Sequence, residues 1–355
     1  MGKKVAVGLS GGVDSSTSAF LLKEKGYKVI GITLKLSSPP CSTTDIQVCC
    51  SPEDVKDAKK VASYLGIEHY VIDWENIFSQ KVIKRFIQDL KDGKTPNPCS
   101  ICNRDVKTGL LARYVKEVLN VDYFATGHYI RKTKKENVEL LSRGIDRKKD
   151  QSYFMALLNK DVIPQLIFPL GDYTKEEVRK IANEKKIPVS QKKDSFEICF
   201  TAGKTPGEYI EENNFFPIEE GEIVHVSGKT LGKHKGLPFY TIGQRRGLGI
   251  RWGKPLYVVD KKPEENLLIV GEEDFLLTDF VEATELSFHI DVEKWDIKNL
   301  YVQGRYKQKP IKVKDFSLEQ NKITVYFEEK QPKFAPGQIL ALYESDTLLG
   351  GGIII

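Results

Sequence analysis

Apolar and amphipathic segments alternate along the first 200 residues of the chain. Four apolar runs predict strands, and they lie at residues 5–9, 28–36, 69–74 and 123–130. Two intervening segments carry apolar side chains at helical spacing, at residues 52–66 and 76–93. This alternation predicts an α/β fold with a doubly wound parallel sheet. Because ligands bind beyond the carboxyl ends of such strands, we expect the loop after residue 9, Leu34 and Gly127 to surround one crevice.

The pattern changes after about residue 205. Residues 205–265 are rich in glycine and basic side chains and carry one short helical pattern, at residues 205–214. Only strand patterns follow, at residues 267–272, 280–290, 300–308, 311–318, 322–329 and 338–345. Strands separated by turn residues predict a small antiparallel barrel. We therefore expect three parts: a nucleotide-binding catalytic domain (1–204), a basic central domain (205–265) and a carboxyl-terminal barrel (266–355).

The loop between the first strand and the helix predicted at residues 17–25 reads SGGVDSS. Gly11 and Gly12 allow a close approach of the backbone, and serine hydroxyls add donors for phosphate oxygens. A helix N-terminus behind such a loop is an anion site. The loop lacks the lysine of a Walker A motif and is not G-x-G-x-x-G, so neither phosphoryl transfer nor a dinucleotide site is indicated. Asp14 is expected to be a helix-start carboxylate or a magnesium ligand.

Composition and charge further restrict the classes of protein to which the chain can belong. With 40% hydrophobic and 29% charged residues and without a long apolar run, the chain is expected to be soluble, cytoplasmic and without membrane contact. The net charge is +5, and residues 229–254 hold seven cations and no carboxylate, interleaved with Phe239, Tyr240 and Trp252. That distribution is typical of nucleic-acid binding. Residues 131–149 carry eight cations against three acids, a balance that a solvated hairpin would share.

Three of the six cysteines lie in segments that we expect to be loops: Cys99 and Cys102 in residues 95–107, and Cys199 in residues 192–200. Thiols in loops are well placed to react. A free thiol is only about 3% ionised at pH 7, however, so it needs nearby cations to stabilise the reactive thiolate. The candidate cations are Arg104, Lys107, Lys192 and Lys193. We interpret Cys41, Cys49 and Cys50 as mainly structural. One C-x-x-C pair alone is weak support for a metal site.

Eight motifs in order resemble the tRNA-specific 2-thiouridylase (MnmA/TrmU) family of PP-loop ATP pyrophosphatases. They are SGGVDS, CCSPEDVKDAKKVA, TPNPCSICNRDVK, TGHYIR, KDQSYFMALL, DSFEICF, GLPFYTIGQRRGLG and LGGGIII. The resemblance implies that ATP, with Mg²⁺, adenylates C2 of the wobble uridine in the anticodon arm of tRNAs for Lys, Glu and Gln. A persulfide sulfur from a partner donor protein then displaces AMP, giving 2-thiouridine.

The resemblance also implies roles for individual residues. Cys199 corresponds to the persulfide carrier, and Cys102 to the thiol that forms a disulfide with it. The residues matching ATP contacts are Gly8, Leu9, Ser10, Gly11, Gly12, Val13, Asp14, Ser15, Leu34 and Gly127. Those matching the target-base loop are Asn97, Pro98 and Cys99. Those matching further tRNA contacts are His128, Lys149, Asp150, Gln151, Arg305, Tyr306 and Gln338.

One departure from the family leaves more than one mechanism open. Many family members have aspartate where this chain has Cys99. Together with Cys102 and Cys199, this third thiol could hold a [4Fe-4S] cluster with one open iron that carries sulfide. Two further hypotheses are a PP-loop synthetase acting on a small metabolite, and a noncatalytic RNA-binding protein in which ATP is a structural ligand.

Overall fold

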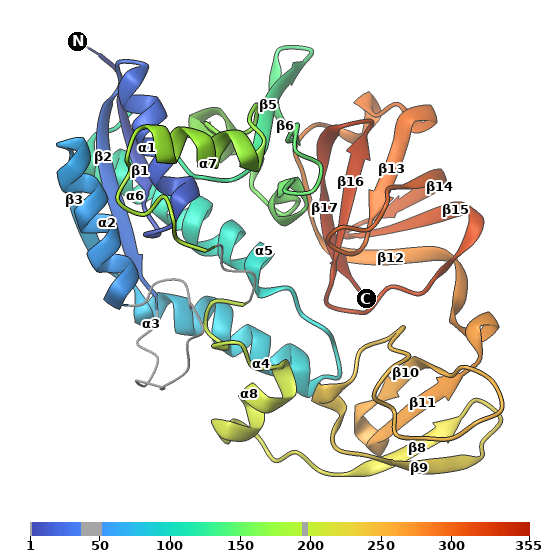
Figure 1. The fold of residues 1–355 in the computed structure, drawn as a ribbon. Coiled ribbons are helices and arrows are strands. Elements are labelled where there is room, and N and C mark those ends of the chain that lie inside the picture. Colours follow the sequence, from blue (N-terminus) through green and yellow to red (C-terminus); the bar gives the residue numbers. More distant parts are fainter. Residues whose placement is uncertain (1, 37–51, 194–197) are drawn as a thin grey trace.

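A computed structural model of the chain describes residues 2–36, 52–193 and 198–355 (Figure 1). Its first sheet is parallel, in the order β3-β2-β1-β4-β7. The strands are β1 (Lys4–Gly8), β2 (Lys28–Lys35), β3 (Glu68–Asp73), β4 (Tyr123–Ala125) and β7 (Leu166–Ile167). The fold class predicted from the sequence is confirmed.

Helices cover both faces of this sheet, because alternate side chains of β1 enter two different cores. Val5 and Val7 pack in the core that contains α1 (Val13–Glu24), α2 (Pro52–Leu65) and α7 (Lys175–Glu184). Ala6 packs in the other core, with α4 (Lys84–Lys91) and α6 (Leu111–Leu119). Such an arrangement follows from the two-residue period of a strand. Helix α1 begins at Val13, four residues earlier than the predicted start at residue 17.

The segment predicted as one helix at residues 76–93 is a continuous helical rod of three consecutive segments, two α-helical and one π-helical. Short α3 (Glu75–Phe78) leads into the π-helical segment Ser79–Ile83 and then into α4. A second π-helical segment, Asn103–Leu110, joins α5 (Pro98–Cys102) to α6. Its geometry requires glycine at position 109, since a Cβ there would lie 2.1 Å from the Arg104 carbonyl oxygen.

The central part of the chain forms a four-stranded sheet in the order β10-β11-β8-β9. The strands are β8 (Gly221–His225), β9 (Thr230–His234), β10 (Tyr257–Lys262) and β11 (Leu267–Gly271), and α8 (Pro206–Glu212) precedes them. The strand patterns placed LLIVGE, which is β11, in the barrel, and this was wrong. β11 pairs in parallel with β8, a contact between distant segments that no local pattern reveals. The three-part division itself stays a prediction.

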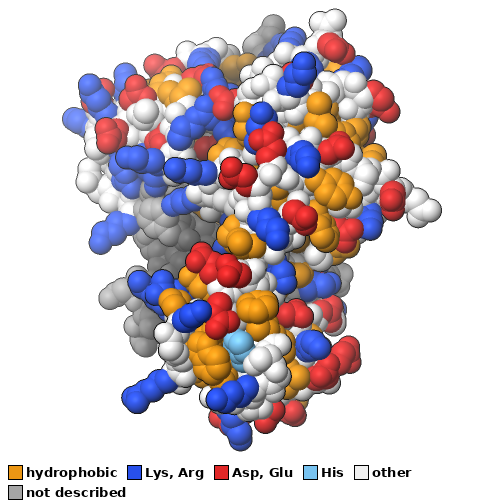
Figure 2. Space-filling view, turned by 90° about the vertical axis from the view of Figure 1, so that its right-hand side faces the viewer, with side chains coloured by type: hydrophobic (Ala, Val, Ile, Leu, Met, Phe, Trp, Pro, Cys, Tyr) orange, Lys and Arg blue, Asp and Glu red, His pale blue; other side chains and the backbone are white. Residues whose placement is uncertain are grey.

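The last third of the chain is an antiparallel barrel that closes through pairing of β12 with β17. Its strands are β12 (Leu277–Phe288), β13 (Leu300–Gln303), β14 (Ile311–Glu319), β15 (Lys322–Pro332), β16 (Ile339–Glu344) and β17 (Thr347–Ile354). The barrel predicted from the strand patterns is confirmed. Figure 2 shows that its outer face carries cations and carboxylates side by side.

A hairpin from the first part of the chain extends the barrel sheet. Strands β5 (Ile130–Lys135) and β6 (Val138–Arg143) follow β4, and β6 pairs with β17 through Leu141 opposite Leu348. The apolar run at residues 123–130 therefore does not form one strand. Its first residues form β4 of the parallel sheet, and Ile130 begins β5 of the barrel sheet. Most cations of the hairpin have carboxylate partners, as Lys132 has Glu139 and Lys135 has Glu344. No helix in the described ranges combines the length and apolar character needed to cross a membrane.

Candidate active site

The loop after β1 is held in shape by its own serines. Ser15 Oγ accepts a hydrogen bond from the Ser10 amide at 3.2 Å, and Ser15 and Ser16 hydroxyls both donate to the Gly12 carbonyl. Gly12 precedes the first residue of α1 and offers no side-chain cap, so the helix N-terminus is left to other acceptors. An open helix N-terminus at the carboxyl edge of the sheet is suited to a phosphate group, and we call residues 10–16 the phosphate cradle.

Two glycines let other segments reach the cradle. Gly11 has φ +70°, and a Cβ there would lie 2.4 Å from the Asp54 carbonyl oxygen at the start of α2. A Cβ at Gly127 would lie 2.8 Å from the Ser15 backbone nitrogen. The backbone after β4 and the start of α2 are thus both in van der Waals contact with the loop. The predicted grouping of this loop with Gly127 therefore has a steric basis.

Asp14, in the first turn of α1, is held by two residues that sequence reasoning missed. Its Oδ1 accepts from the Tyr129 hydroxyl at 2.8 Å and pairs with the nearly buried Lys175 Nζ at 2.7 Å. Lys175 begins α7, 161 residues along the chain, so no local signal could have identified it. Because Oδ1 is engaged, Asp14 would offer Mg²⁺ its other carboxylate oxygen. A magnesium role for Asp14 stays a prediction.

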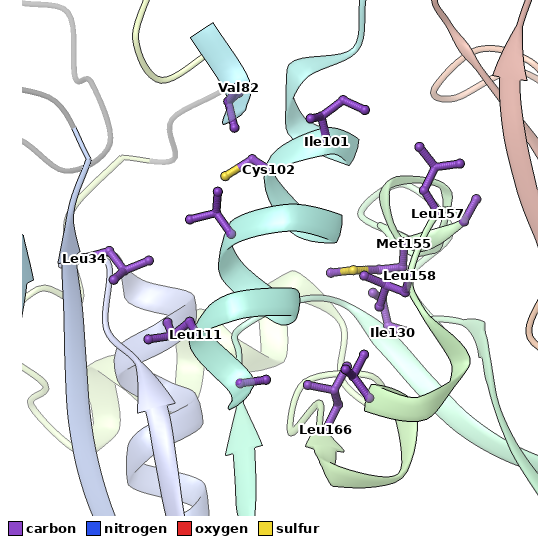
Figure 3. Packing of buried hydrophobic residues seen from close by; sticks show 14 of the residues in the cluster. Leu34, Val82, Ile101, Cys102, Leu111, Ile130, Met155, Leu157, Leu158 and Leu166 are labelled. Carbon is purple, nitrogen blue, oxygen red and sulfur yellow. The ribbon is translucent and has the colours of Figure 1, made fainter. Parts of the chain in front are cut away.

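Leu34, a predicted ATP contact, packs on the thiol side of the sheet. It lies near the end of β2, is 7% exposed, and belongs to the same apolar cluster as Cys102 and Leu111. Figure 3 shows the Cys102 side chain pointing from α5 into this cluster, close to Val82. Leu9 and Val13, at either side of the cradle loop, pack instead in the core that contains α1 and α2.

The three thiols of the predicted chemistry occupy different environments. Cys99 is exposed, Cys199 is half-buried and Cys102 is buried. Burial raises the pKa of the Cys102 thiol to about 11, and the Lys107 ammonium opposes this only in part. Cys99 and Cys102 both lie in α5, so the prediction that they lie in a loop was wrong. Cys41, Cys49 and Cys50, interpreted as structural, lie outside the described residues.

The structure offers no support for a cluster on these thiols. Within the described ranges, which include Cys99, Cys102 and Cys199, no three histidine, cysteine or acidic side chains are grouped so as to hold a metal ion. The residues present do not fit a [4Fe-4S] cluster, and no step of the chemistry is derived through one.

Of the cations proposed to activate the thiols, Lys107 is the one whose charge acts on Cys102. Arg104 instead pairs with Asp105 and with Glu285 of β12, and it thereby ties the π-helical segment to the barrel. Lys192 is shared between two carboxylates of α2, those of Asp54 and Asp57.

The predicted target-base loop lies where the three parts of the chain meet. Asn97 Oδ1 accepts from the Ser100 amide at 3.1 Å and so caps α5, with Pro98 in its first turn. Two residues earlier, Thr95 contacts the barrel through hydrogen bonds with the Pro336 carbonyl and the Gln338 side chain. Its hydroxyl also lies 3.4 Å from that of Thr241 in the central part. This junction fixes the position of the loop.

Several predicted tRNA contacts surround this junction. Gln338 Nε2 donates to the Thr95 carbonyl at 2.8 Å. Tyr306 stacks on Phe154 with ring centroids 4.6 Å apart, and Arg305 donates to the Lys333 carbonyl at 3.0 Å. Of these three, Gln338 contacts the segment that leads into the loop, whereas Tyr306 and Arg305 contact other residues.

Asp150, Lys149 and Gln151 follow the β5–β6 hairpin. Asp150 is 7% exposed and pairs with the buried Arg143 at 3.1 Å, so its carboxylate is part of the interior. Gln151 exchanges hydrogen bonds with the Tyr129 backbone, and Lys149 is partly exposed. A tRNA contact for these three residues stays a prediction.

His128 follows the glycine that contacts the cradle. Its Nδ1 is 2.8 Å from the Thr126 hydroxyl, and its ring packs edge-on against Phe168. Burial first, and then the Lys107 charge, lower the pKa of His128 to about 3. His128 is therefore neutral at physiological pH and can bind a polar group without adding charge.

Comparison with known proteins matches the chain in three consecutive segments. The family descriptions are "tRNA methyl transferase HUP domain" over residues 3–203, "tRNA methyl transferase PRC-barrel domain" over 209–272, and "Aminomethyltransferase beta-barrel domain" over 278–354. A protein of Persephonella marina named tRNA-specific 2-thiouridylase MnmA is 65% identical over 99% of this chain and 100% of its own length. One of the same name from Aquifex aeolicus is 50% identical over 99% and 98%.

Solved structures give weaker likenesses. A 4-thiouridine synthetase in complex with RNA and ATP is 18% identical, with a TM-score of 0.37, over 57% of this chain and 46% of that one. An NMN synthetase of Francisella tularensis is 16% identical, with a TM-score of 0.33, over 54% and 66%.

Proposed function

The chain belongs to the family of tRNA-specific 2-thiouridylases, and from that premise we propose how its residues carry out the reaction. It is a tRNA sulfurtransferase, and the reaction proposed is ATP-dependent replacement of O2 by sulfur in the wobble uridine of tRNAs for Lys, Glu and Gln. The observation that carries this is identity of up to 65% over the whole chain to relatives of that name. These names favour an RNA substrate over a small metabolite and an enzyme over a passive RNA-binding protein.

The first proposed step uses the phosphate cradle. The amides at the start of α1, in the loop that Ser10 and Ser15 hold in shape, bind the β- and γ-phosphates of ATP, and Mg²⁺ would balance the charge of these phosphates. The C2 carbonyl oxygen of the uridine attacks the α-phosphorus, and pyrophosphate leaves with the electron pair. This step is needed because an oxygen bound to C2 is a poor leaving group, whereas AMP is a good one. The packing of Gly11 and Gly127 against neighbouring backbone supports a preformed cradle.

The second proposed step transfers sulfur. A donor protein loads Cys199 with a sulfane sulfur, and this terminal sulfur attacks C2 of the adenylated base, so that AMP departs. The Cys102 thiolate then attacks Cys199 Sγ. The S–S bond breaks, the 2-thio group keeps the electron pair, and a Cys102–Cys199 disulfide remains for an external thiol to reduce. With a pKa near 11 Cys102 is protonated in the structure described, so substrate binding has to expose it.

The test is nucleoside analysis by mass spectrometry of unmodified tRNA incubated with the protein, ATP, Mg²⁺ and a persulfide donor. We expect 2-thiouridine with the native protein and none with Cys199→Ser, which retains ATP binding because position 199 is outside the cradle. Failure of the native protein to form any 2-thiouridine would reject the proposal. Equal product from native protein and Cys199→Ser would reject the assigned sulfur carrier.

A further inference from the structure

A basic, exposed turn in the central part of the chain has no role in the chemistry described above. Residues 241–247, TIGQRRG, lie in the acid-free stretch at 229–254. We call them the arginine turn. Its two arginines, Arg245 and Arg246, are exposed. Within the described ranges neither guanidinium makes a hydrogen bond or ion pair.

The arginine turn is rigid although it contains no helix or strand. The Gln244 side chain accepts from the Thr241 amide at 3.1 Å and donates to the Arg246 carbonyl at 2.9 Å, so it crosses the turn from one end to the other. Two backbone hydrogen bonds with Val258 attach the turn to β10. Two arginines on a fixed frame lose less entropy on binding an anion than two on a flexible loop.

The arginine turn also has a fixed position relative to the target-base loop. Thr241 approaches Thr95, two residues before Asn97, and Figure 1 shows the segment before α5 passing beside the chain that leads to β10. On the other side, Gly243 packs against the Arg305 guanidinium, where a Cβ would lie 2.9 Å from Nη2. The turn is therefore a neighbour both of the loop and of the barrel surface around Arg305.

We infer that the arginine turn is a phosphate clamp for the RNA strand that carries the target uridine. Guanidinium forks match phosphate oxygens, and a contact to backbone phosphates positions a strand without reading its sequence. The inference rests on the proposed function, since it names which part of that RNA the turn holds. The clamp keeps the nucleotides flanking the target base in place while the base enters the site.

The test measures binding of an anticodon stem-loop RNA by fluorescence anisotropy at several KCl concentrations. For Arg245→Ala/Arg246→Ala we expect about tenfold weaker binding. The slope of log K against log[KCl] should fall by about 1.4 in magnitude, because two phosphate contacts are lost at about 0.7 each. In thiolation assays the loss appears in KM rather than kcat. Unchanged affinity and salt slope would overturn the inference.

Matched variants separate the clamp from general charge. Arg245→Lys/Arg246→Lys keeps both charges and should retain the salt slope with a smaller loss of affinity. Lys59→Ala/Lys60→Ala removes two exposed cations from α2, at the opposite end of the molecule in Figure 1, and should bind as the native protein does. Unfolding temperatures show that each variant is folded.

Three outcomes separate a failure of this inference from a failure of the proposed function. A double alanine variant that binds whole tRNA weakly but the stem-loop normally would overturn the placement of the clamp beside the target base. Native protein that binds neither RNA would reject the proposed function itself, whereas a double alanine variant that thiolates tRNA as well as the native protein does would reject the clamp alone.

Discussion

The phosphate cradle and the thiol region differ in how far they are preformed in this structure. The cradle is complete within seven consecutive residues: serine hydroxyls shape it, and neighbouring backbone packs against Gly11. The thiols differ in their exposure to solvent. Cys99 is exposed, Cys102 is buried with a pKa near 11, and Cys199 is half-buried. The nucleotide half is thus preorganised, whereas the sulfur half requires a rearrangement before its thiols can react.

The largest effect that we expect is a difference in reactivity between Cys102 and the exposed Cys99, and measuring it tests this comparison. A pKa raised from 9.0 to about 11 leaves a hundredfold less thiolate below pH 9 than in an ordinary cysteine. We expect iodoacetamide to label Cys99 at least about 100 times faster than Cys102, measured by peptide mass spectrometry. Labelling of Cys102 should rise tenfold for each pH unit up to about 11.

Two conditions serve as controls for that measurement. In denaturant both thiols should react at similar rates, because the difference arises from folding. Saturation with ATP and tRNA should accelerate labelling of Cys102 if the sulfur half assembles on substrate binding. Equal rates in the native, unliganded protein would contradict the burial of this thiol.

A substitution in the cradle should have the next largest effect. Gly11→Ala places a Cβ 2.4 Å from the Asp54 carbonyl oxygen on a backbone with φ +70°. We expect a loss of about 2–4 kcal/mol in the free energy of unfolding or in ATP binding, measured by chemical denaturation and calorimetry.

Gly26→Ala is the matched control. Gly26 has φ +82°, but a Cβ added there would meet nothing within 4 Å, so only the backbone cost of about 1–2 kcal/mol remains. If Gly11→Ala behaves like Gly26→Ala and binds ATP normally, the cradle is not rigidly preformed and the contrast between the two regions fails.

The smallest expected effect concerns Lys107, whose charge acts on both regions. It lowers the pKa of His128 next to the cradle and the pKa of Cys102 in the thiol region. Lys107→Gln should therefore raise both pKa values, each by less than about one unit. NMR titration of the histidine and the pH profile of Cys102 labelling measure the two shifts. A shift in opposite directions would show that Lys107 is not the common neighbour.

The features that depend on local pattern were predictable from the sequence. The alternation of strands and helices defined the sheet, and the SGGVDSS loop defined the cradle, since both are encoded in short stretches. Helix α1 begins earlier than predicted because the serines near its start bond to backbone within the first turn instead of extending the loop.

Features formed by distant segments were not predictable in this way. Lys175 reaches Asp14 across 161 residues, and β11 pairs with β8 rather than joining the barrel that follows it. Cys102 was predicted to lie in a loop because prolines precede it. Pro98 instead starts a helix, because the amide proton that proline lacks has no hydrogen-bond partner in the first turn of a helix. Its burial depends on Val82 and Leu34, which no spacing around residue 102 reveals.

The pairing of the β5–β6 hairpin with β17 also orders events during protein synthesis. Ser142 leaves the ribosome long before its partner Thr347, so the outer edge of β6 stays without its neighbour until about 200 further residues have been translated. Docking of the hairpin on β17 therefore comes well after its own synthesis. A nascent chain stalled before residue 347 would hold a folded nucleotide half whose hairpin remains undocked.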